Sequence, residues 1–293
     1  MPTITSPLRY PGGKTKALRQ IIPYLPARFS SYREPFVGGG SLFIYLKQAH
    51  PHLPVWINDL NRDLYCFWRI AQTDLIRLTH TVAELQQRAK DGRKLFTELT
   101  TNCRVAELSD FARAVRFFVL NRITFSGTIE AGGYSQQAFE RRFTPTAVAR
   151  LARLDLVLKR DVRITNHDYE KLLTVPGDND KDAGDVFIFL DPPYLRATKS
   201  KLYGKNGALH TSFDHVRFAR ALEQCPHKWL ITYDDSPAVR RNFSFAGAHI
   251  YEWQLQYGMN NFGRTFAPKG KELFITNYPV PHNRGQSLEV RGQ

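Results

Sequence analysis

The sequence has few cysteines and no metal-binding motif. Only three cysteines, Cys66, Cys103 and Cys225, occur in 293 residues, and none of them is spaced as C-x-x-C. This excludes a disulfide framework and a zinc site built from cysteine pairs, and it fits a reducing compartment. The nine histidines include no H-E-x-x-H motif, so we expect no metal ion.

Long apolar runs are absent as well. No segment approaches the roughly 20 apolar residues of a membrane-spanning helix. The N-terminus also lacks the apolar core of a signal peptide. We therefore expect a cytoplasmic protein with no membrane partner.

Acidic residues are outnumbered by basic ones. The chain has 41 Lys and Arg against 27 Asp and Glu, which gives a formal net charge of +14. Such an excess favours a polyanionic partner, with nucleic acid ahead of a membrane surface. A length of 293 residues allows one α/β core with an insertion, or two small domains.

One stretch organises the rest of the chain. Residues 186–190 (VFIFL) are typical of a short strand buried on both faces of a parallel sheet, and Asp191, Pro192, Pro193 and Tyr194 follow directly. Ligands of open α/β sheets bind beyond the carboxyl ends of the strands, so this DPPY corner should face a crevice. The proline rings restrict the backbone, which leaves Asp191 and the carbonyl of Pro192 as two fixed acceptors.

Two fixed acceptors suit a substrate that carries an amino group. The exocyclic amine of adenine or cytosine is a poor nucleophile, because its lone pair is delocalised into the ring. Hydrogen bonds to Asp191 and Pro192 would turn that lone pair toward an electrophile, and Tyr194 offers a face on which a base can stack. The alternative is a proline-stiffened turn after a core strand, with Asp191 as a helix cap.

Three further segments indicate a nucleoside-bearing cofactor. Residues 6–16 (SPLRYPGGKTK) lead into a helix, and Lys14 would attract a phosphate or a carboxylate there, although the spacing is not that of a P-loop. Asp59 follows a glycine turn at 38–40 by about 20 residues, which is the spacing of a carboxylate that binds ribose hydroxyls. Asp168, after a third strand, would bond the cofactor's adenine. The alternatives are a solvated basic turn and two helix N-caps.

Residues 61–159 have mostly helical periodicity, and so long a helical stretch between two strands predicts an inserted lobe. The segment 104–163 holds eleven Arg or Lys against six Asp or Glu, interleaved with aromatic residues such as Phe125. Basic side chains contact phosphates and aromatic ones can wedge or stack, whereas the alternative is a solvated basic face over an aromatic core. We predict DNA contacts, here and in the loop after DPPY, by Arg113, Arg116, Arg122, Glu130, Tyr134, Arg141, Arg142, Lys199 and Lys201.

The order of elements predicts an α/β protein with one mostly parallel sheet of about seven strands. The expected strands are 32–37, 55–58, 162–166, 186–190, 229–233, 248–253 and 272–276. We predict a catalytic domain from residues 1–60 and 160–280, a helical lobe at 61–159, and a polar tail at 281–293.

With these segments in place, the chain resembles the Dam-type, D12 class adenine-specific DNA methyltransferases of the alpha order. The motifs RYPGGK, EPFVGGGS, INDLN, FVLNRITFSG, NHD, FLDPPY, SFDH, WLITYDDS and KELFITNY follow that family's order and extend to Tyr278. The resemblance implies a Rossmann-like S-adenosylmethionine-dependent methyltransferase fold with an inserted target-recognition lobe. It further implies methyl transfer to the N6 amine of adenine in double-stranded DNA after base flipping.

The resemblance also implies roles for individual residues. Lys14 would lie near the carboxylate of S-adenosylmethionine, Asp59 would hold the ribose hydroxyls, and Asp168 would read the cofactor's adenine. Residues 191–194 would be the catalytic tetrapeptide. The cofactor-binding residues implied are Tyr10, Lys14, Phe36, Gly38, Gly40, Asp59, Asp168 and Asp191.

At one place the chain departs from the family pattern. Members that recognise GATC usually carry an arginine a few residues after this FNG-like turn, whereas residues 128–130 here are Thr-Ile-Glu. Glu130 would accept from a cytosine amine, but it cannot donate to guanine as arginine does. The sequence therefore leaves the DNA recognition site open.

Other functions fit parts of the pattern. Methylation of another amine, such as cytosine N4 or adenine in RNA, would use the same acceptors, and a catalytically silent DNA-binding module would keep the fold. A carbon-5 cytosine methyltransferase usually needs a Pro-Cys nucleophile, and the chain has only the reverse, Cys225-Pro226. The intact Lys14, Asp59 and Asp191 argue against a silent module. We expect a monomer, with a cognate restriction endonuclease as a candidate partner.

Overall fold

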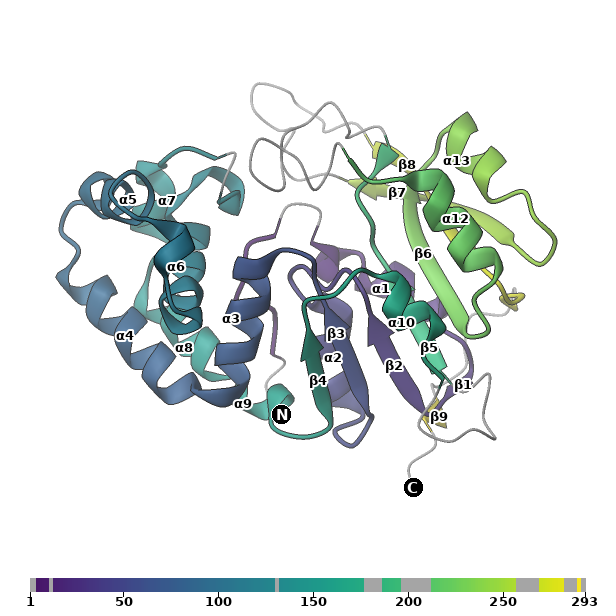
Figure 1. The fold of residues 1–293 in the computed structure, drawn as a ribbon, viewed down its shortest axis with the longest axis horizontal. Helices are drawn as coiled ribbons and strands as arrows, with labels where there is room; N and C mark the ends of the chain where they lie inside the picture. Colours follow the sequence, from purple (N-terminus) through teal and green to yellow (C-terminus); the bar gives the residue numbers. More distant parts are fainter. Residues whose placement is uncertain are drawn as a thin grey trace.

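The computed structural model describes residues 4–10, 13–129, 132–176, 186–195, 212–256, 269–281 and 289–290. Its centre is a seven-stranded sheet with the strand order β4-β3-β2-β5-β6-β8-β7 (Figure 1). The strands are β2 (Ser31–Glu34), β3 (Val55–Asn58), β4 (Val162–Thr165), β5 (Val186–Leu190), β6 (Lys228–Asp234), β7 (His249–Gln256) and β8 (Lys269–Thr276). Each strand lies where the sequence predicts one.

The strand directions match the predicted fold class. Strands β4, β3, β2, β5 and β6 pair in parallel, and β8 runs antiparallel between β6 and β7. An open, mostly parallel sheet with one reversed strand and helices on both faces is a Rossmann-like α/β fold, as predicted.

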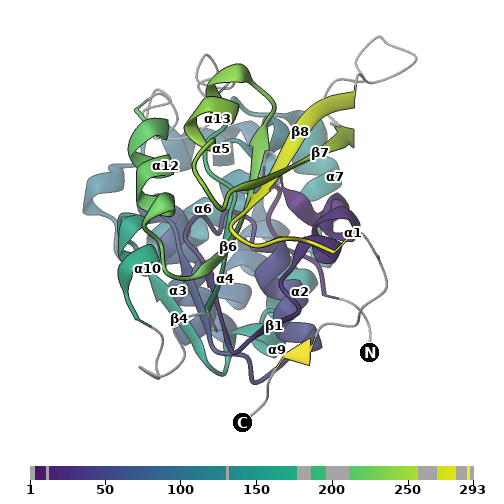
Figure 2. The same cartoon turned by 90° about the vertical axis from the view of Figure 1, so that its right-hand side faces the viewer.

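Strand β5 lies between two apolar cores. Phe187 and Phe189 pack into the core that holds α2 (Ser41–Ala49), whereas Ile188 and Leu190 face the other core. That second core is completed by α10 (Glu170–Thr174), α12 (His215–Glu223) and α13 (Pro237–Asn242). Figure 2 shows α10 and α12 on one side of the sheet and α1 (Leu18–Ile21) with α2 on the other. Burial on both faces explains why this strand is apolar throughout.

The segment between β3 and β4 is helical, as predicted, and lies beside the sheet (Figure 1). Its helices are α3 (Arg62–Thr73), α4 (Leu75–Arg88), α5 (Gly92–Thr100), α6 (Asp110–Ile123), α7 (Gln136–Arg142), α8 (Pro145–Ala152) and α9 (Asp155–Leu158). Phe67 of α3 and Phe118 of α6 belong to the same apolar core as Phe43 of α2. The helical segment is therefore joined to the sheet by packing as well as by the chain.

The remaining elements are short. Strand β1 (Arg28–Phe29) pairs in parallel with β9 (Glu289–Val290), and the 3-10 helices are η1 (Lys14–Lys16), η2 (Ile22–Tyr24), η3 (Val105–Glu107) and η4 (Phe125–Gly127). Strand β9 lies within the predicted polar tail at 281–293. Main-chain hydrogen bonds hold such a pair, so polar side chains do not prevent it. In the segments that the structure describes, no helix is both long and apolar enough to cross a bilayer.

Candidate active site

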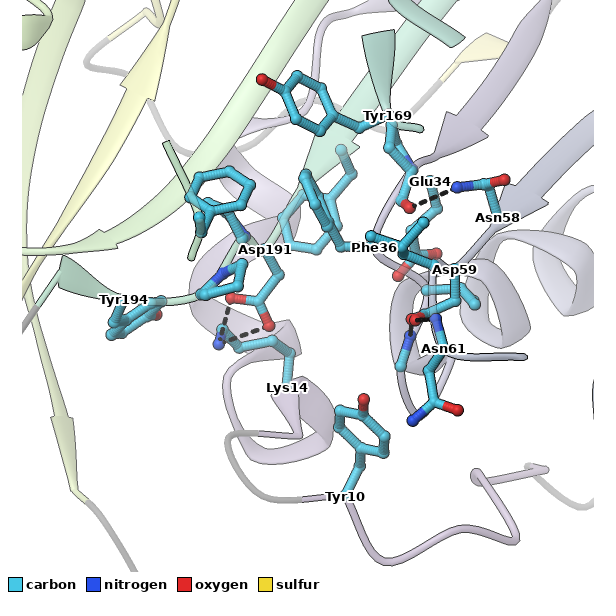
Figure 3. Close-up of a pocket in the computed structure, with 18 of the residues that line it drawn as sticks. Tyr10, Lys14, Glu34, Phe36, Asn58, Asp59, Asn61, Tyr169, Asp191 and Tyr194 are labelled. Carbon is cyan, nitrogen blue, oxygen red and sulfur yellow. Dashed lines mark hydrogen bonds and ion pairs between the residues drawn. The ribbon is translucent and has the colours of Figure 1, made fainter. Parts of the chain in front are cut away.

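A cavity of about 610 Å³ lies beyond the carboxyl ends of β2, β3 and β5 (Figure 3). The N-terminal turn and the corner that follows β5 meet at one side of it, where Lys14 contacts Asp191, and Asp59 lies across the cavity from them. All residues predicted to bind a cofactor or to act in catalysis line this one cavity: Tyr10, Lys14, Phe36, Gly38, Gly40, Asp59, Asp168, Asp191, Pro192, Pro193 and Tyr194. The fold thus brings together side chains that lie far apart in the sequence.

Asp191 is held in place by two other side chains. The Lys14 ammonium lies 2.7 Å from Asp191 Oδ1 and 2.8 Å from Oδ2, and the Thr232 hydroxyl donates to Oδ1 at 2.7 Å (Figure 3). Lys14 is only 5% exposed. The sequence did not predict this ion pair, which fixes the orientation of the carboxylate at the end of β5.

The Tyr194 side chain contacts one residue through its hydroxyl and another through its ring. Its hydroxyl donates to Glu272 Oε2 at 2.9 Å, and the Lys14 ammonium lies 5.1 Å from its ring centroid. Glu272 is 1% exposed and comes from β8. The sequence interpretation missed Glu272, although a carboxylate inside the apolar run ELFIT was a signal.

The turn between β2 and α2 lets the backbone approach the cavity. Gly38 and Gly40 have φ angles of 47° and 66°, a region that favours glycine. The Tyr10 ring packs against Gly38 so closely that a Cβ atom there would lie 2.9 Å from Tyr10 Cε1. A side chain at residue 38 would therefore displace Tyr10 from the cavity wall.

Asp59 lies directly against this turn. Its carboxylate accepts from Gly38 N at 3.1 Å and from Asn61 N at 3.0 Å. Burial raises the pKa of Asp59 to about 6, although these two hydrogen bonds lower it. Helix α3 begins at Arg62 and is capped by Asn61, so the alternative prediction of Asp59 as the N-cap was wrong.

Asp168 and Phe36 form another part of the wall. Asp168 accepts from Glu170 N at 3.0 Å at the start of α10, and it pairs with Arg217 of α12 at 3.3 Å. Both side chains are about half exposed. The Phe36 ring packs against Tyr169, with their centroids 5.6 Å apart. An aromatic surface beside a carboxylate is a suitable place for a purine.

Glu34 is a cavity residue that the sequence interpretation did not single out. It accepts from the Tyr32 hydroxyl at 2.8 Å and from Phe43 N at 3.2 Å. Burial raises the pKa of Glu34 to about 8, and the neighbouring Asp191 and Asp59 add to this effect. Its position in EPFVGGGS, at the end of β2, was the available signal.

Two of the predicted DNA contacts, Arg113 and Arg116, pair with a carboxylate of the protein itself. Arg113 Nη1 lies 2.6 Å from Asp63 Oδ1, and Arg116 Nη1 lies 3.0 Å from Asp63 Oδ2. Both guanidinium groups also donate to backbone carbonyls, and all three side chains are mostly buried. These arginines are used inside the protein, so they are not available to phosphates.

Arg122, at the end of the same helix, is in a different environment. It is 3% exposed and donates to Asn121 Oδ1 at 3.0 Å, while its Nε has no partner within the described residues. Burial lowers the pKa of Arg122 to about 9, and the positive charges of Arg9, Arg150 and Arg142 add to the effect. Among the described residues, no carboxylate pairs with any of these four arginines, which we call the arginine cluster.

The other predicted DNA contacts differ in exposure. Arg141 and Arg142 are exposed at the end of α7, and Tyr134 is half-buried with its hydroxyl bonded to Gln136.

Phe125 is 70% exposed at η4, where Ser126 has a φ of 54°. Glu130, Lys199 and Lys201 lie outside the described residues.

The described residues contain no group of three or more His, Cys, Asp or Glu that could hold a metal ion. Four acidic side chains of the cavity, Glu34, Asp59, Asp168 and Asp191, are each bound to other protein groups.

The chain matches a family model described as D12 class N6 adenine-specific DNA methyltransferase over residues 10–259. Type II methyltransferase M1.LlaDCHI of Lactococcus lactis subsp. cremoris is 24% identical over 284 residues, which cover 92% of this chain and 94% of that protein. Type II methyltransferase M.MjaIII of Methanocaldococcus jannaschii is 28% identical over 212 residues, 67% of this chain and 71% of that protein. The DNA N-6-adenine-methyltransferase of Escherichia phage P1 is 27% identical over 252 residues, 83% of this chain and 31% of that protein.

The family match includes the glycine turn, the helical segment and the DPPY corner, which are the parts that build the cavity and its surroundings. The chain therefore belongs to the D12 class N6 adenine-specific DNA methyltransferase family, and it is a DNA adenine methyltransferase.

Proposed function

We propose that this enzyme transfers a methyl group from S-adenosylmethionine to the exocyclic N6 amine of an adenine rotated out of double-stranded DNA. One observation supports this most strongly: a single cavity joins the glycine turn and Asp59 to the DPPY corner. A cofactor at the first place and a base at the second would lie side by side. The bound cofactor supplies an electrophilic methyl group on a sulfonium.

The cavity residues suit S-adenosylmethionine. The cavity volume of about 610 Å³ is within the usual range for a cofactor site. The Asp59 carboxylate is positioned by two backbone N–H groups to accept from ribose hydroxyls, as acidic residues after glycine turns do in related folds. Phe36 and Asp168 offer a stacking face and an acceptor for adenine. We assign these three residues, with Tyr10 and the glycines, to cofactor binding.

The DPPY corner suits the target amine. The Asp191 carboxylate and the Pro192 carbonyl accept its two N–H groups, which leaves the nitrogen lone pair directed at the methyl group. Lys14 and Thr232 prevent the carboxylate from rotating away. As the nitrogen gains a methyl group it must lose a proton, and Asp191 is the base in position to take it. Tyr194 provides the stacking face for the extruded base.

The arginine cluster suits the DNA backbone. Phosphate contacts position a protein on duplex DNA, and bidentate arginine is the side chain that makes them best. Four arginines that no described carboxylate neutralises are an unfavourable arrangement in the free protein, and a phosphodiester would relieve it. We therefore assign phosphate contacts to Arg9, Arg122, Arg142 and Arg150, in place of Arg113 and Arg116.

Phe125 suits the extrusion of a base. Unstacking and unpairing one base costs a few kcal/mol, and apolar side chains inserted between bases repay part of that cost. Phe125 is the exposed aromatic of the turn that carries Thr124 and Ser126, next to the arginine cluster. Tyr134 lies near the same turn, because residues 124 and 134 form a β-bridge.

A modification role beside a restriction endonuclease is also part of the proposal. Two relatives are named type II methyltransferases, and a Modification methylase StsI of Streptococcus sanguinis is 28% identical over 303 residues, 94% of this chain and 43% of that protein. Such a partner would cut the DNA sequence that this chain methylates.

Labelled methyl transfer tests the chemistry. The protein is incubated with genomic or plasmid duplex DNA and S-adenosylmethionine with a labelled methyl group, and the DNA is then digested to nucleosides. We expect the label in N6-methyl-2′-deoxyadenosine. Label in N4-methyl-2′-deoxycytidine, or label in RNA from a parallel incubation but none in DNA, would assign another amine. Absence of label with DNA binding retained would indicate a silent binding module.

A further inference from the structure

Asn121 is a buried amide whose hydrogen-bonding capacity is fully used. It lies in the last turn of α6 and is 0% exposed. Its Nδ2 donates to the carbonyls of Arg9 at 2.7 Å and Gly127 at 3.1 Å. Its Oδ1 accepts from the backbone N–H of Arg9 at 2.8 Å and from Arg122 Nη2 at 3.0 Å. One side chain therefore joins three parts of the chain, which are the N-terminal segment, the turn after α6 and the end of α6 itself.

The first of these segments leads to the cofactor side of the cavity. Arg9 is followed by Tyr10, whose ring packs over Gly38 in the glycine turn. Because Asn121 bonds both the N–H and the C=O of Arg9, it fixes the backbone directly before Tyr10. A displacement of Tyr10 would therefore shift the Arg9 backbone, to which Asn121 is hydrogen-bonded.

The second and third segments lead to the side that we assign to DNA. Gly127 closes the turn that exposes Phe125, and Arg122 belongs to the arginine cluster. The contact between Gly127 and Arg9 is so close that a Cβ at residue 127 would lie 2.3 Å from the Arg9 carbonyl oxygen. Arg9 Nη1 also donates to the Thr124 carbonyl at 3.3 Å. The turn and the N-terminal segment are thus packed as one unit around Asn121.

We propose that Asn121 is a positioning residue that couples occupancy of the cofactor pocket to the placement of the DNA-facing turn. This inference rests on the proposed function. A ligand that orders Tyr10 and the glycine turn would hold Arg9, and through Asn121 it would hold Gly127, Phe125 and Arg122 in the arrangement that binds DNA. By thermodynamic linkage, DNA would then tighten cofactor binding by the same factor.

The test compares DNA affinity with and without a cofactor product. The probes are S-adenosylhomocysteine and a short fluorescein-labelled duplex that the wild type methylates, with fluorescence anisotropy as the readout. For the wild type we expect saturating S-adenosylhomocysteine to tighten the Kd for DNA by roughly 5-fold or more. For Asn121→Asp we expect the Kd without S-adenosylhomocysteine and the Kd with it to be nearly equal, a ratio near one. The reason is that the new carboxylate oxygen cannot donate to the carbonyls of Arg9 and Gly127.

A matched control is available at Gln72. Its amide donates to the carbonyls of Leu158 and Val162 and accepts from Arg69, so it makes the same kinds of bonds as Asn121. Val162 starts β4, so these bonds lie at the edge of the sheet opposite the cavity. Gln72→Glu makes the same amide-to-acid change there, and it should keep the wild-type ratio.

Several results would overturn the inference. It fails if S-adenosylhomocysteine tightens the Kd for DNA of Asn121→Asp as much as that of the wild type, or if Gln72→Glu loses this effect as well. It also fails if S-adenosylhomocysteine leaves the Kd of the wild type unchanged. Should Asn121→Asp not fold, Gly127→Ala tests the same contact from the other side, because its Cβ meets the Arg9 carbonyl. The proposed function fails separately, through a wild type that yields no N6-methyl-2′-deoxyadenosine.

Discussion

The cavity and the end of α6 differ in whether a carboxylate balances their positively charged side chains. In the cavity, the Lys14 ammonium lies within 2.8 Å of both oxygens of Asp191, so the positive charge is neutralised by the protein itself. In the arginine cluster around Arg122, no carboxylate of the described residues balances the charge. A site that is already balanced suits an uncharged group such as a base amine, whereas an unbalanced positive site suits a polyanion.

Helix α6 contains both kinds of environment. Arg113 and Arg116 share Asp63, while Arg122, less than two turns further along the helix, has no acidic partner among the described residues. These arginines look alike in the sequence. Their environments differ because of one carboxylate, Asp63, that reaches α6 from α3.

The largest effect is expected from Asp191→Ala, which removes the balancing charge in the cavity. Methyl transfer should fall by more than about 100-fold, because the target amine loses its acceptor and its base. DNA affinity should stay within about 2-fold of the wild type, because the arginine cluster is untouched. Single-turnover methyl transfer and anisotropy measure the two quantities.

A neighbouring aspartate provides the control for this change. Asp235 follows β6 and pairs with Arg240 at 2.7 Å, and it does not line the cavity. Asp235→Ala should leave the rate of transfer nearly unchanged. Wild-type turnover in Asp191→Ala would rule out the role assigned to that carboxylate.

The second effect concerns stability. Asp63→Asn leaves two mostly buried guanidinium groups without their counter-charge, so the free energy of unfolding should fall by about 3 kcal/mol. Asp110→Asn is the matched control, because Asp110 pairs with Arg62 at 2.7 Å in an exposed position, where an ion pair contributes about 0–1 kcal/mol. Urea denaturation of both variants measures the difference. Equal losses would show that the buried pair has no special role.

The third effect concerns DNA binding. Arg142→Gln and Arg150→Gln should each reduce the slope of log K against log salt by about 1, because each removes one phosphate contact. Unfolding free energies should not fall, since neither side chain has a carboxylate partner among the described residues. Arg69→Gln, an exposed arginine on α3, is the control and should keep the wild-type slope. Unchanged slopes in both cluster variants would place the phosphate contacts elsewhere.

The same contrast explains what the sequence could predict. Positions at the ends of strands are set by the fold, so the strand 186–190 and its DPPY corner were enough to place Asp191, and the glycine spacing was enough to place Asp59. All seven strands of the sheet follow from apolar periodicity, which reports burial directly.

Partners across the fold could not be predicted in this way. The Lys14 to Asp191 pair spans 177 residues, and Asp63 meets Arg116 across 53. Which charge meets which depends on how helices pack, and no local pattern contains that information. The same reason hid Glu272 and Asn121, whose roles come from contacts with distant segments. Glu34 was missed although its partners Tyr32 and Phe43 lie within nine residues of it.

The smallest effect is a pH dependence at Glu34, a cavity carboxyl with no basic partner among its described contacts. Its pKa is raised to about 8 in the folded protein, above its ordinary value in the unfolded chain, so the folded state keeps the proton longer. The stability that this proton contributes is complete at acid pH and is lost as the pH rises through about 8. Between pH 7 and 8 the wild type should therefore lose about 1 kcal/mol relative to Glu34→Gln, which cannot titrate. Urea denaturation at both pH values measures this, with the exposed Glu98→Gln as control, and parallel pH profiles for the wild type and Glu34→Gln would contradict it.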